Sequence, residues 1–297
     1  MRPVTIAMLL VSLALFGCGD DEPDETGVVV VATTTQLADF ARQVAGKRAR
    51  VEQILTPNAD PHDYEPRPSD ARALEGADVV LRSGGDLDEW LGELIESSGT
   101  DAESLDVSRV VRRRKGDPHW WQDPRNAEAA VKAIRDALVK ADPEGRATYE
   151  KNAGAYLARL GTLDRAVAAC IGKLPRDQRK LVTTHDALGY YAERYGLRVI
   201  GAVIPSLSSQ AQPSSKDVGE LVDQIREQNV KAIFPESSLN SKLERAISRE
   251  SGAAVGGELW ADTLGPKGSS GATYIDSIEA NTRAIAGGLS GGAIRCF

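Results

Sequence analysis

Three histidines are the residues whose type and spacing most clearly indicate chemistry. His62 and His119 each end an Asp-Pro-His triplet, and His185 stands in the segment Thr-Thr-His-Asp. Each lies in a short polar stretch that follows a strand-like run. In a chain of 297 residues with 14 prolines and 3 histidines, chance predicts on the order of 0.01 such triplets. Because the triplet occurs twice, we interpret the three histidines as parts of one functional site.

Metal binding is the chemistry that these histidines favour. His119 lies 57 residues after His62 and 66 residues before His185, which excludes a local zinc-finger site, because ligands of such a site lie close together. The spacing suits loops at the carboxyl ends of different parallel strands, which meet in one crevice. Since neutral imidazoles leave the charge of a divalent metal uncompensated, we expect a carboxylate as fourth ligand. Asp262, which follows the last strand-like segment, is the candidate.

Short runs rich in β-branched residues predict the buried strands that would position these loops. They cover residues 28–33, 51–55, 78–82, 181–184, 199–204 and 230–234. Helix-length periodic stretches lie between them, at residues 37–45, 87–96, 218–228 and 239–251. This alternation of strands and helices predicts parallel sheets with helices on both faces.

The middle of the chain, residues 126–174, has helix-favouring residues and no strand signal. Asp142 and Pro143 fit the cap and first turn of a helix that continues to Ile171. Such a helix would be about 40 Å long, which exceeds one small lobe. We therefore predict an α/β fold of two lobes, each a mainly parallel sheet with flanking helices, joined by one long rigid helix. The predicted parts are an N-lobe (28–141), the linking helix (142–174), and a C-lobe (175–297) with a loosely held Gly-rich tail at 287–297.

The N-terminus has the pattern of an export signal. Residues 1–17 combine one positive charge with a short apolar run, which is typical of a secretory signal and shorter than the roughly 20 residues of a membrane span. Leu-Phe-Gly-Cys at 15–18 resembles a bacterial lipobox, so we expect Cys18 to be acylated and residues 18–27 to form an acidic tether. The predicted location is extracytoplasmic, with the protein lipid-anchored to a bacterial membrane. A retained N-terminal anchor is the alternative.

Composition and charge exclude several other classes of protein. Hydrophobic residues make up 41% of the chain and charged residues 27%, which is ordinary for a globular protein and excludes a mostly disordered chain. The net charge of -7 argues against a nucleic-acid partner, which would require a basic face.

Four motifs together resemble the zinc/manganese solute-binding lipoproteins of bacterial ABC importers, the ZnuA/TroA-like family. They lie at residues 58–66, 117–121, 184–190 and 259–265, and the segment 213–236 is also family-like. The resemblance implies two α/β lobes with a metal site in the cleft between them. It implies ligands from His62, His119, His185 and Asp262, and a role for Glu236 beside a ligand rather than on the metal. The implied partner is a membrane permease, and we expect a monomer.

The ligand set favours zinc as the transported ion. Three imidazoles and one carboxylate suit tetrahedral Zn²⁺, whereas Mn²⁺ prefers more oxygen ligands. Manganese or iron import on the same fold is the alternative, because the His-rich loop of many zinc-specific members is missing here. Its place is taken by the basic run 107–116, which we expect to be a solvated edge strand.

Other functions and one covalent link remain open at this stage. A metalloenzyme needs an open metal position, whereas four protein ligands close a tetrahedral site, so we predict no enzymatic activity. A metal-chelate receptor and a surface adhesin of the cell-adhesion type are further alternatives. Cys170 and Cys296 can pair outside the cytoplasm, where disulfides persist, but sequence does not give the distance between them.

Overall fold

The structure is a computed structural model that describes residues 27–297. The predicted signal segment 1–17, the predicted acylation site Cys18 and the tether up to residue 26 lie outside the described residues. Among the helices of the described part, none combines the length and the apolar character needed to cross a membrane.

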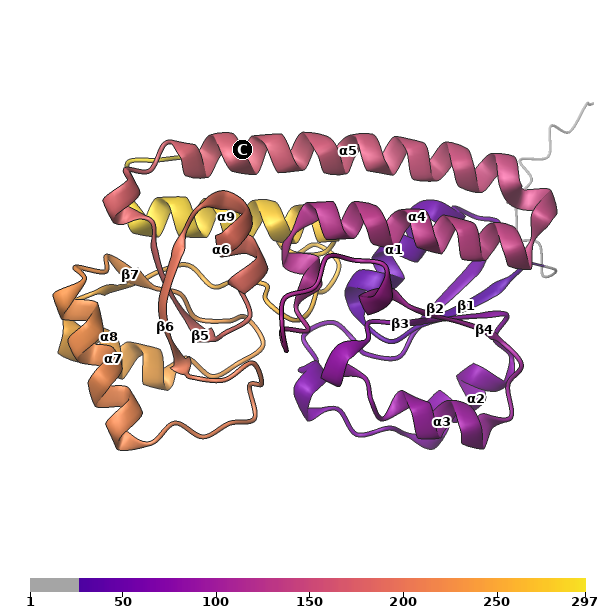
Figure 1. Ribbon diagram of the computed structural model, residues 1–297, viewed down its shortest axis with the longest axis horizontal. Helices are drawn as coiled ribbons and strands as arrows, with labels where there is room; N and C mark the ends of the chain where they lie inside the picture. Colours follow the sequence, from indigo (N-terminus) through magenta and orange to yellow (C-terminus); the bar gives the residue numbers. More distant parts are fainter. Residues whose placement is uncertain (1–26) are drawn as a thin grey trace, which may run out of the picture.

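The N-lobe contains a four-stranded parallel sheet in the order β2-β1-β3-β4. The strands are β1 (Val29–Ala32), β2 (Arg50–Gln53), β3 (Val79–Arg82) and β4 (Glu103–Asp106). Helices α1 (Thr35–Ala45) and α4 (Pro124–Ala141) cover one face, and α2 (Pro68–Glu75) and α3 (Leu91–Ser98) cover the other (Figure 1). Val30 and Val31 therefore enter different hydrophobic clusters on opposite faces, which explains the uninterrupted apolar pattern of the central strand.

The C-lobe contains two pairs of parallel strands. They are β5 (Lys180–His185) with β6 (Arg198–Ile204), and β7 (Ala232–Ile233) with β8 (Ala254–Val255). A parallel bridge between Thr183 and Phe234 connects the pairs. The helices are α6 (Gly189–Tyr195), α7 (Ser215–Glu227), α8 (Lys242–Ser251) and α9 (Tyr274–Leu289), with α7 and α8 on the outer side (Figure 1). The predicted two-lobe α/β fold with parallel sheets is confirmed.

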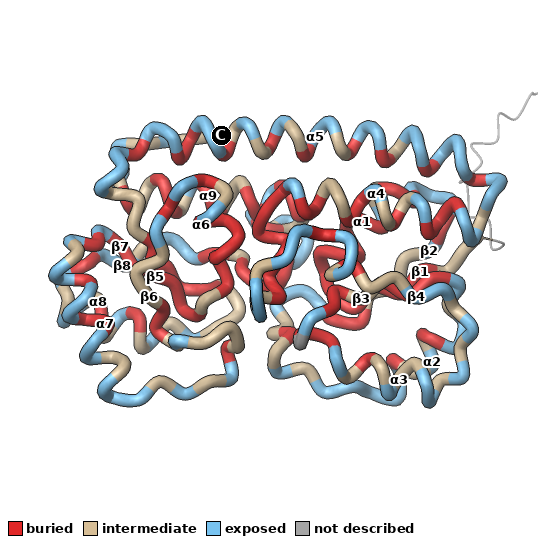
Figure 2. The backbone as a smooth tube through the Cα atoms, viewed as in Figure 1, coloured by how far each residue is buried: buried red, intermediate tan, exposed pale blue. Residues whose placement is uncertain are grey.

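One long helix, α5 (Arg146–Gly172), extends over both lobes (Figure 1). It packs against α1 and α4 of the N-lobe and against α6 and α9 of the C-lobe. Its buried residues form one stripe facing the lobes, while the outer side is exposed (Figure 2), as the helical period requires. A short 3-10 turn at Pro143–Gly145 precedes it, capped by Asp142, so the α-helix begins three residues after the predicted start.

The Gly-rich tail is not loosely held, contrary to the expectation for 287–297. Helix α9 continues to Leu289, and a disulfide joins Cys296 to Cys170 near the end of α5. Ile294 and Cys296 also pack against the main hydrophobic cluster. The covalent link and the apolar contacts hold a segment whose composition alone suggested mobility.

The expectation of a solvated edge strand at 107–116 is also wrong. The edge strand is β4, and the basic run after it begins with a short 3-10 turn at Val107–Arg109. Arg112 Nη1 and Arg114 Nη1 then each lie 2.7 Å from a carboxylate oxygen of Glu193 on α6. These two ion pairs connect the run to α6 of the C-lobe, because Glu193 offers one carboxylate oxygen to each arginine.

The turn between α4 and α5 yields a prediction about acid stability. Hydrogen bonds from Arg48, aided by Tyr149 and Gly145, lower the pKa of Asp142 from 3.8 to about 2, more than its slight burial raises that pKa. A carboxylate with a lowered pKa stabilises the fold above its unfolded pKa and loses this contribution as pH falls toward the folded value.

Asp142→Asn should therefore lower the free energy of unfolding by about 1 kcal/mol or less at pH 7, because solvent screens a pair in which the Arg48 side chain is 40% exposed. The difference from wild type should shrink between pH 4 and pH 2, where the native carboxylate becomes protonated. Urea unfolding of both proteins at several pH values measures this difference in the free energy of unfolding. A difference that stays constant with pH would contradict the electrostatic explanation.

Candidate metal centre

The two Asp-Pro-His triplets form similar local turns in the N-lobe. Asp60 Oδ1 accepts the backbone N–H of His62 at 2.9 Å, and Asp117 Oδ1 accepts that of His119 at 3.0 Å. Such Asp-centred turns, with a proline fixing φ at the next residue, hold the third residue in a defined direction. The repeated triplet therefore fixes the direction in which each histidine leaves its loop.

The two candidate ligands of the C-lobe lie at the ends of extended segments. His185 is the last residue of β5, and Asp262 follows Leu259, which forms a parallel bridge with Glu236. Carboxyl ends of parallel strands meet at one edge of a sheet, and here that edge faces the N-lobe (Figure 1). Two side chains from each lobe thus come together between the lobes.

The structure brings all four predicted ligands together, with one ligand atom of each within 4.8 Å of the others. His119 Nε2 lies 3.4 Å from His62 Nε2 and 3.3 Å from His185 Nε2. Asp262 Oδ2 lies 3.4 Å from His62 Nε2 and 3.1 Å from His185 Nε2, and its Oδ1 lies 3.4 Å from His119 Nε2. Nitrogen and oxygen atoms at these distances enclose a space for one ion.

The four side chains of this cluster are buried, and one of them is more accessible to solvent than the other three. The side chains of His119 and His185 are 0% exposed and that of Asp262 is 3% exposed, whereas that of His62 is 8% exposed. Trp121 Nε1 and Gln122 Nε2 of the N-lobe donate to the carbonyl of Ala261, at 2.8 and 2.6 Å. These hydrogen bonds cross the lobe boundary and hold Ala261, the residue directly before Asp262, in place.

Carboxylates hold the far ring nitrogens of two of the histidines. Asp117 Oδ1 lies 2.9 Å from His119 Nδ1, and Glu236 Oε1 lies 2.7 Å from His185 Nδ1. Such contacts orient the ring and leave Nε2 free for a metal. Glu236 thus contacts a histidine and is outside the four-residue cluster. The sequence analysis assigned no role to Asp117, although its position two residues before His119 could have indicated one.

Comparison with known proteins identifies the family. The family described as "Zinc-uptake complex component A periplasmic" (ZnuA) matches residues 30–288. The chain belongs to this family. Members of the ZnuA family are substrate-binding proteins of ABC importers and not enzymes, which removes the metalloenzyme alternative.

Individual relatives are similar over nearly the whole chain but are named for different metals. The manganese-binding lipoprotein MntA of Halalkalibacterium halodurans is 33% identical over 98% of this chain and 100% of its own. The iron-binding protein YfeA of Yersinia pestis is 33% identical over 96% of this chain and 94% of its own. The solved structure of the periplasmic zinc-binding protein TroA from Treponema pallidum has a TM-score of 0.81 and 29% identity, covering 89% of this chain and 99% of that one.

The electrostatics of the cluster favour a bound cation. Burial lowers the pKa of His185, but the charges of Asp262 and Glu236 outweigh it and raise that pKa well above 6.5. Burial raises the pKa of Asp262, but the charges of His185 and His119 outweigh it and lower that pKa well below 3.8. Asp262 Oδ1 is buried and has no hydrogen-bond partner within the described residues. The buried carboxylate therefore requires positive charge beside it, as a proton or as a metal ion.

The contact between Glu236 and His185 yields a prediction about stability. Glu236 Oε1 accepts both the backbone N–H of His185, at 3.0 Å, and its ring Nδ1–H, at 2.7 Å. Glu236→Leu should lower the free energy of unfolding of the metal-free protein by about 1–3 kcal/mol, because two buried donors lose their acceptor. Glu236→Gln keeps an acceptor oxygen and should cost less. Urea unfolding compares the two variants, and equal losses would assign the effect to the charge of the carboxylate instead of to its role as an acceptor.

Proposed function

We propose that this chain is the extracytoplasmic solute-binding protein of an ABC importer and that it captures Zn²⁺ with His62, His119, His185 and Asp262. The ion would bind in the cleft between the lobes and pass to a membrane permease. Family membership supports the role in an importer, and the relatives named as metal-binding lipoproteins support the class of cargo and the anchored location. In this proposal Cys18 carries the lipid and the working form is a monomer.

The separation of the ligand atoms is the observation that carries the proposal. Metal–ligand bonds of about 2.0–2.1 Å in a tetrahedral site place neighbouring ligand atoms about 3.3–3.4 Å apart. Five contacts among the four residues measure 3.1–3.4 Å and involve both carboxylate oxygens of Asp262, and one ligand atom of each residue lies within 4.8 Å of the other three. Four side chains from four separate loops converge at these separations, as a bound metal ion requires.

Nitrogen-rich ligation favours zinc over manganese as the cargo. By the Irving–Williams order, a site of three imidazoles binds Zn²⁺ more tightly than Mn²⁺ or Fe²⁺. The relative named for zinc supports this choice, and those named for manganese and iron make these ions the alternative cargo. A chelate receptor is disfavoured, because four converging side chains leave little coordination space for a chelator.

Metal content and the effect of removing His185 test the proposed site. After exposure to equal Zn²⁺ and Mn²⁺, mass spectrometry should find one zinc per chain, and His185→Ala should weaken zinc binding by at least about 100-fold. Asp186→Asn, in the adjacent position, is the matched control and should bind like wild type. Preferential binding of manganese would overturn the choice of zinc, and the absence of bound metal would overturn the site.

Histidine ligation also predicts a pH dependence. Each ligand nitrogen must be deprotonated to bind the metal, so metal and protons compete. Because nearby carboxylates raise the pKa of His185 well above 6.5, lowering the pH from 7.5 to 5 favours its protonated ring and should weaken zinc binding steadily. Chelator competition at fixed ionic strength measures the affinity at each pH. An affinity that does not change across this range would argue against histidine ligands.

A further inference from the structure

Each Asp-Pro-His turn of the N-lobe receives a hydroxyl group from the C-lobe. Ser209 Oγ donates to Asp60 Oδ2 at 2.6 Å, and Tyr190 OH donates to the carbonyl of Asp117 at 3.2 Å. Asp60 and Asp117 are the residues that hold the backbones of His62 and His119. Both N-lobe histidines are thus connected, through one aspartate each, to a side chain on the opposite lobe.

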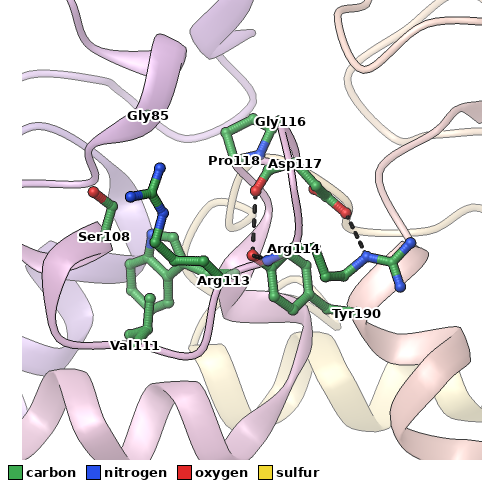
Figure 3. A pocket seen from close by; sticks show the side chains of 10 residues that line it. Gly85, Ser108, Val111, Arg113, Arg114, Gly116, Asp117, Pro118 and Tyr190 are labelled. Atoms are coloured by element: carbon green, nitrogen blue, oxygen red, sulfur yellow. Dashed lines mark hydrogen bonds and ion pairs between the residues drawn. The ribbon is translucent and has the colours of Figure 1, made fainter.

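The contact at Asp117 is one of several on the His119 side. Tyr190 OH also accepts the N–H of Arg114 at 2.7 Å, and Arg114 Nε lies 3.1 Å from Asp117 Oδ2 (Figure 3). A Cβ at Gly189 would lie 2.8 Å from both Arg114 and Asp117, so a glycine permits this close approach of α6. The cavity here measures only about 60 Å³. Together with the Glu193 ion pairs, these contacts join the His119 turn to α6 of the C-lobe.

The two Asp-Pro-His turns border one cavity at the lobe boundary. Its volume is about 350 Å³, and it is lined by Pro61, His62 and Pro118 from the N-lobe and by residues 206–208 from the C-lobe. His62 is the most exposed of the four site residues. Near its turn, contacts across the boundary include the Ser209–Asp60 hydrogen bond and a longer backbone bond from Asn58 to Leu264, at 3.3 Å.

The loop that carries Ser209 is ordered by its own serines and starts beside His185. The N–H of Asp186 donates to the carbonyl of Ser206 at 2.9 Å. Ser206 Oγ accepts the N–H of Ser208 at 3.0 Å, and Ser208 Oγ accepts that of Gln210 at 3.2 Å. Ser209 itself is 9% exposed. Its hydroxyl is therefore held in a fixed place relative to the C-lobe ligands.

We propose that Ser209 is a positioning residue for the metal site, acting on His62 through Asp60. Asp60 uses one carboxylate oxygen for the His62 backbone and the other for Ser209, so the approach of the lobes adds a second hydrogen bond to the His62 turn. Without this bond the turn is less firmly held against the ligands of the C-lobe. This inference rests on the proposed function, because it assigns a positioning residue to that same site.

The hydrogen bond forms between lobes that are already together, so it stabilises the bound state and not the first encounter with the metal. Its loss should appear in the dissociation rate and leave the association rate within about twofold of wild type. Ser209→Ala should release zinc about tenfold faster, as expected for a hydrogen bond to a charged group. Gln210→Ala, an exposed neighbour, is the control and should release zinc like wild type.

The experiment is stopped-flow release of Zn²⁺ from the zinc-loaded full chain into excess chelator, combined with measured association rates. In a His62→Ala background, Ser209→Ala should cause no further acceleration, because its effect passes through His62. Unchanged release from Ser209→Ala, or equal acceleration in both backgrounds, would overturn the positioning role. Failure of the wild-type chain to bind zinc would instead overturn the proposed function.

Discussion

The buried carboxylate of Asp262 is the charge on which the arrangement of both lobes depends. Its side chain is 3% exposed, and its two oxygens face three histidine rings. A buried charge is costly unless it is paired and hydrogen-bonded. The two lobes together supply the compensating groups, with His62 and His119 from the N-lobe and His185 from the C-lobe. The parallel sheets and α5 bring these loops together.

The parts of the fold that follow local patterns could be predicted from the sequence. The β-branched runs became β1, β3, β5 and β6, because β-branched side chains favour the strand conformation. The Asp-Pro-His triplets predicted grouped histidines, because the triplet repeats and its turn chemistry is local. In contrast, β4 has the sequence Glu-Ser-Leu-Asp and is only partly buried, so neither its apolar content nor its alternation marked it as a strand.

The parts that depend on distant partners could not be predicted. The arginines at 112 and 114 are placed by Glu193, which lies about 80 residues away in the chain. Cys296 is held by Cys170 at a sequence separation of 126 residues. Ser209 lies in a polar loop without periodicity, and its contact with Asp60 follows only from the approach of the lobes. Sequence identified which residues could bind a metal and placed Glu236 beside a ligand, but the contacts of Asp117 and Ser209 required the structure.

The division of the apolar interior has a consequence for how the molecule unfolds. The largest cluster continues from the N-lobe helices through α5 into α6 and α9, whereas two smaller clusters lie beneath α7 and α8 and beneath α2 and α3. This shared cluster couples the two lobes, so the loss of packing in one lobe should weaken the other. The outer layers over the smaller clusters can open locally and exchange their amide hydrogens without disturbing the centre of the molecule.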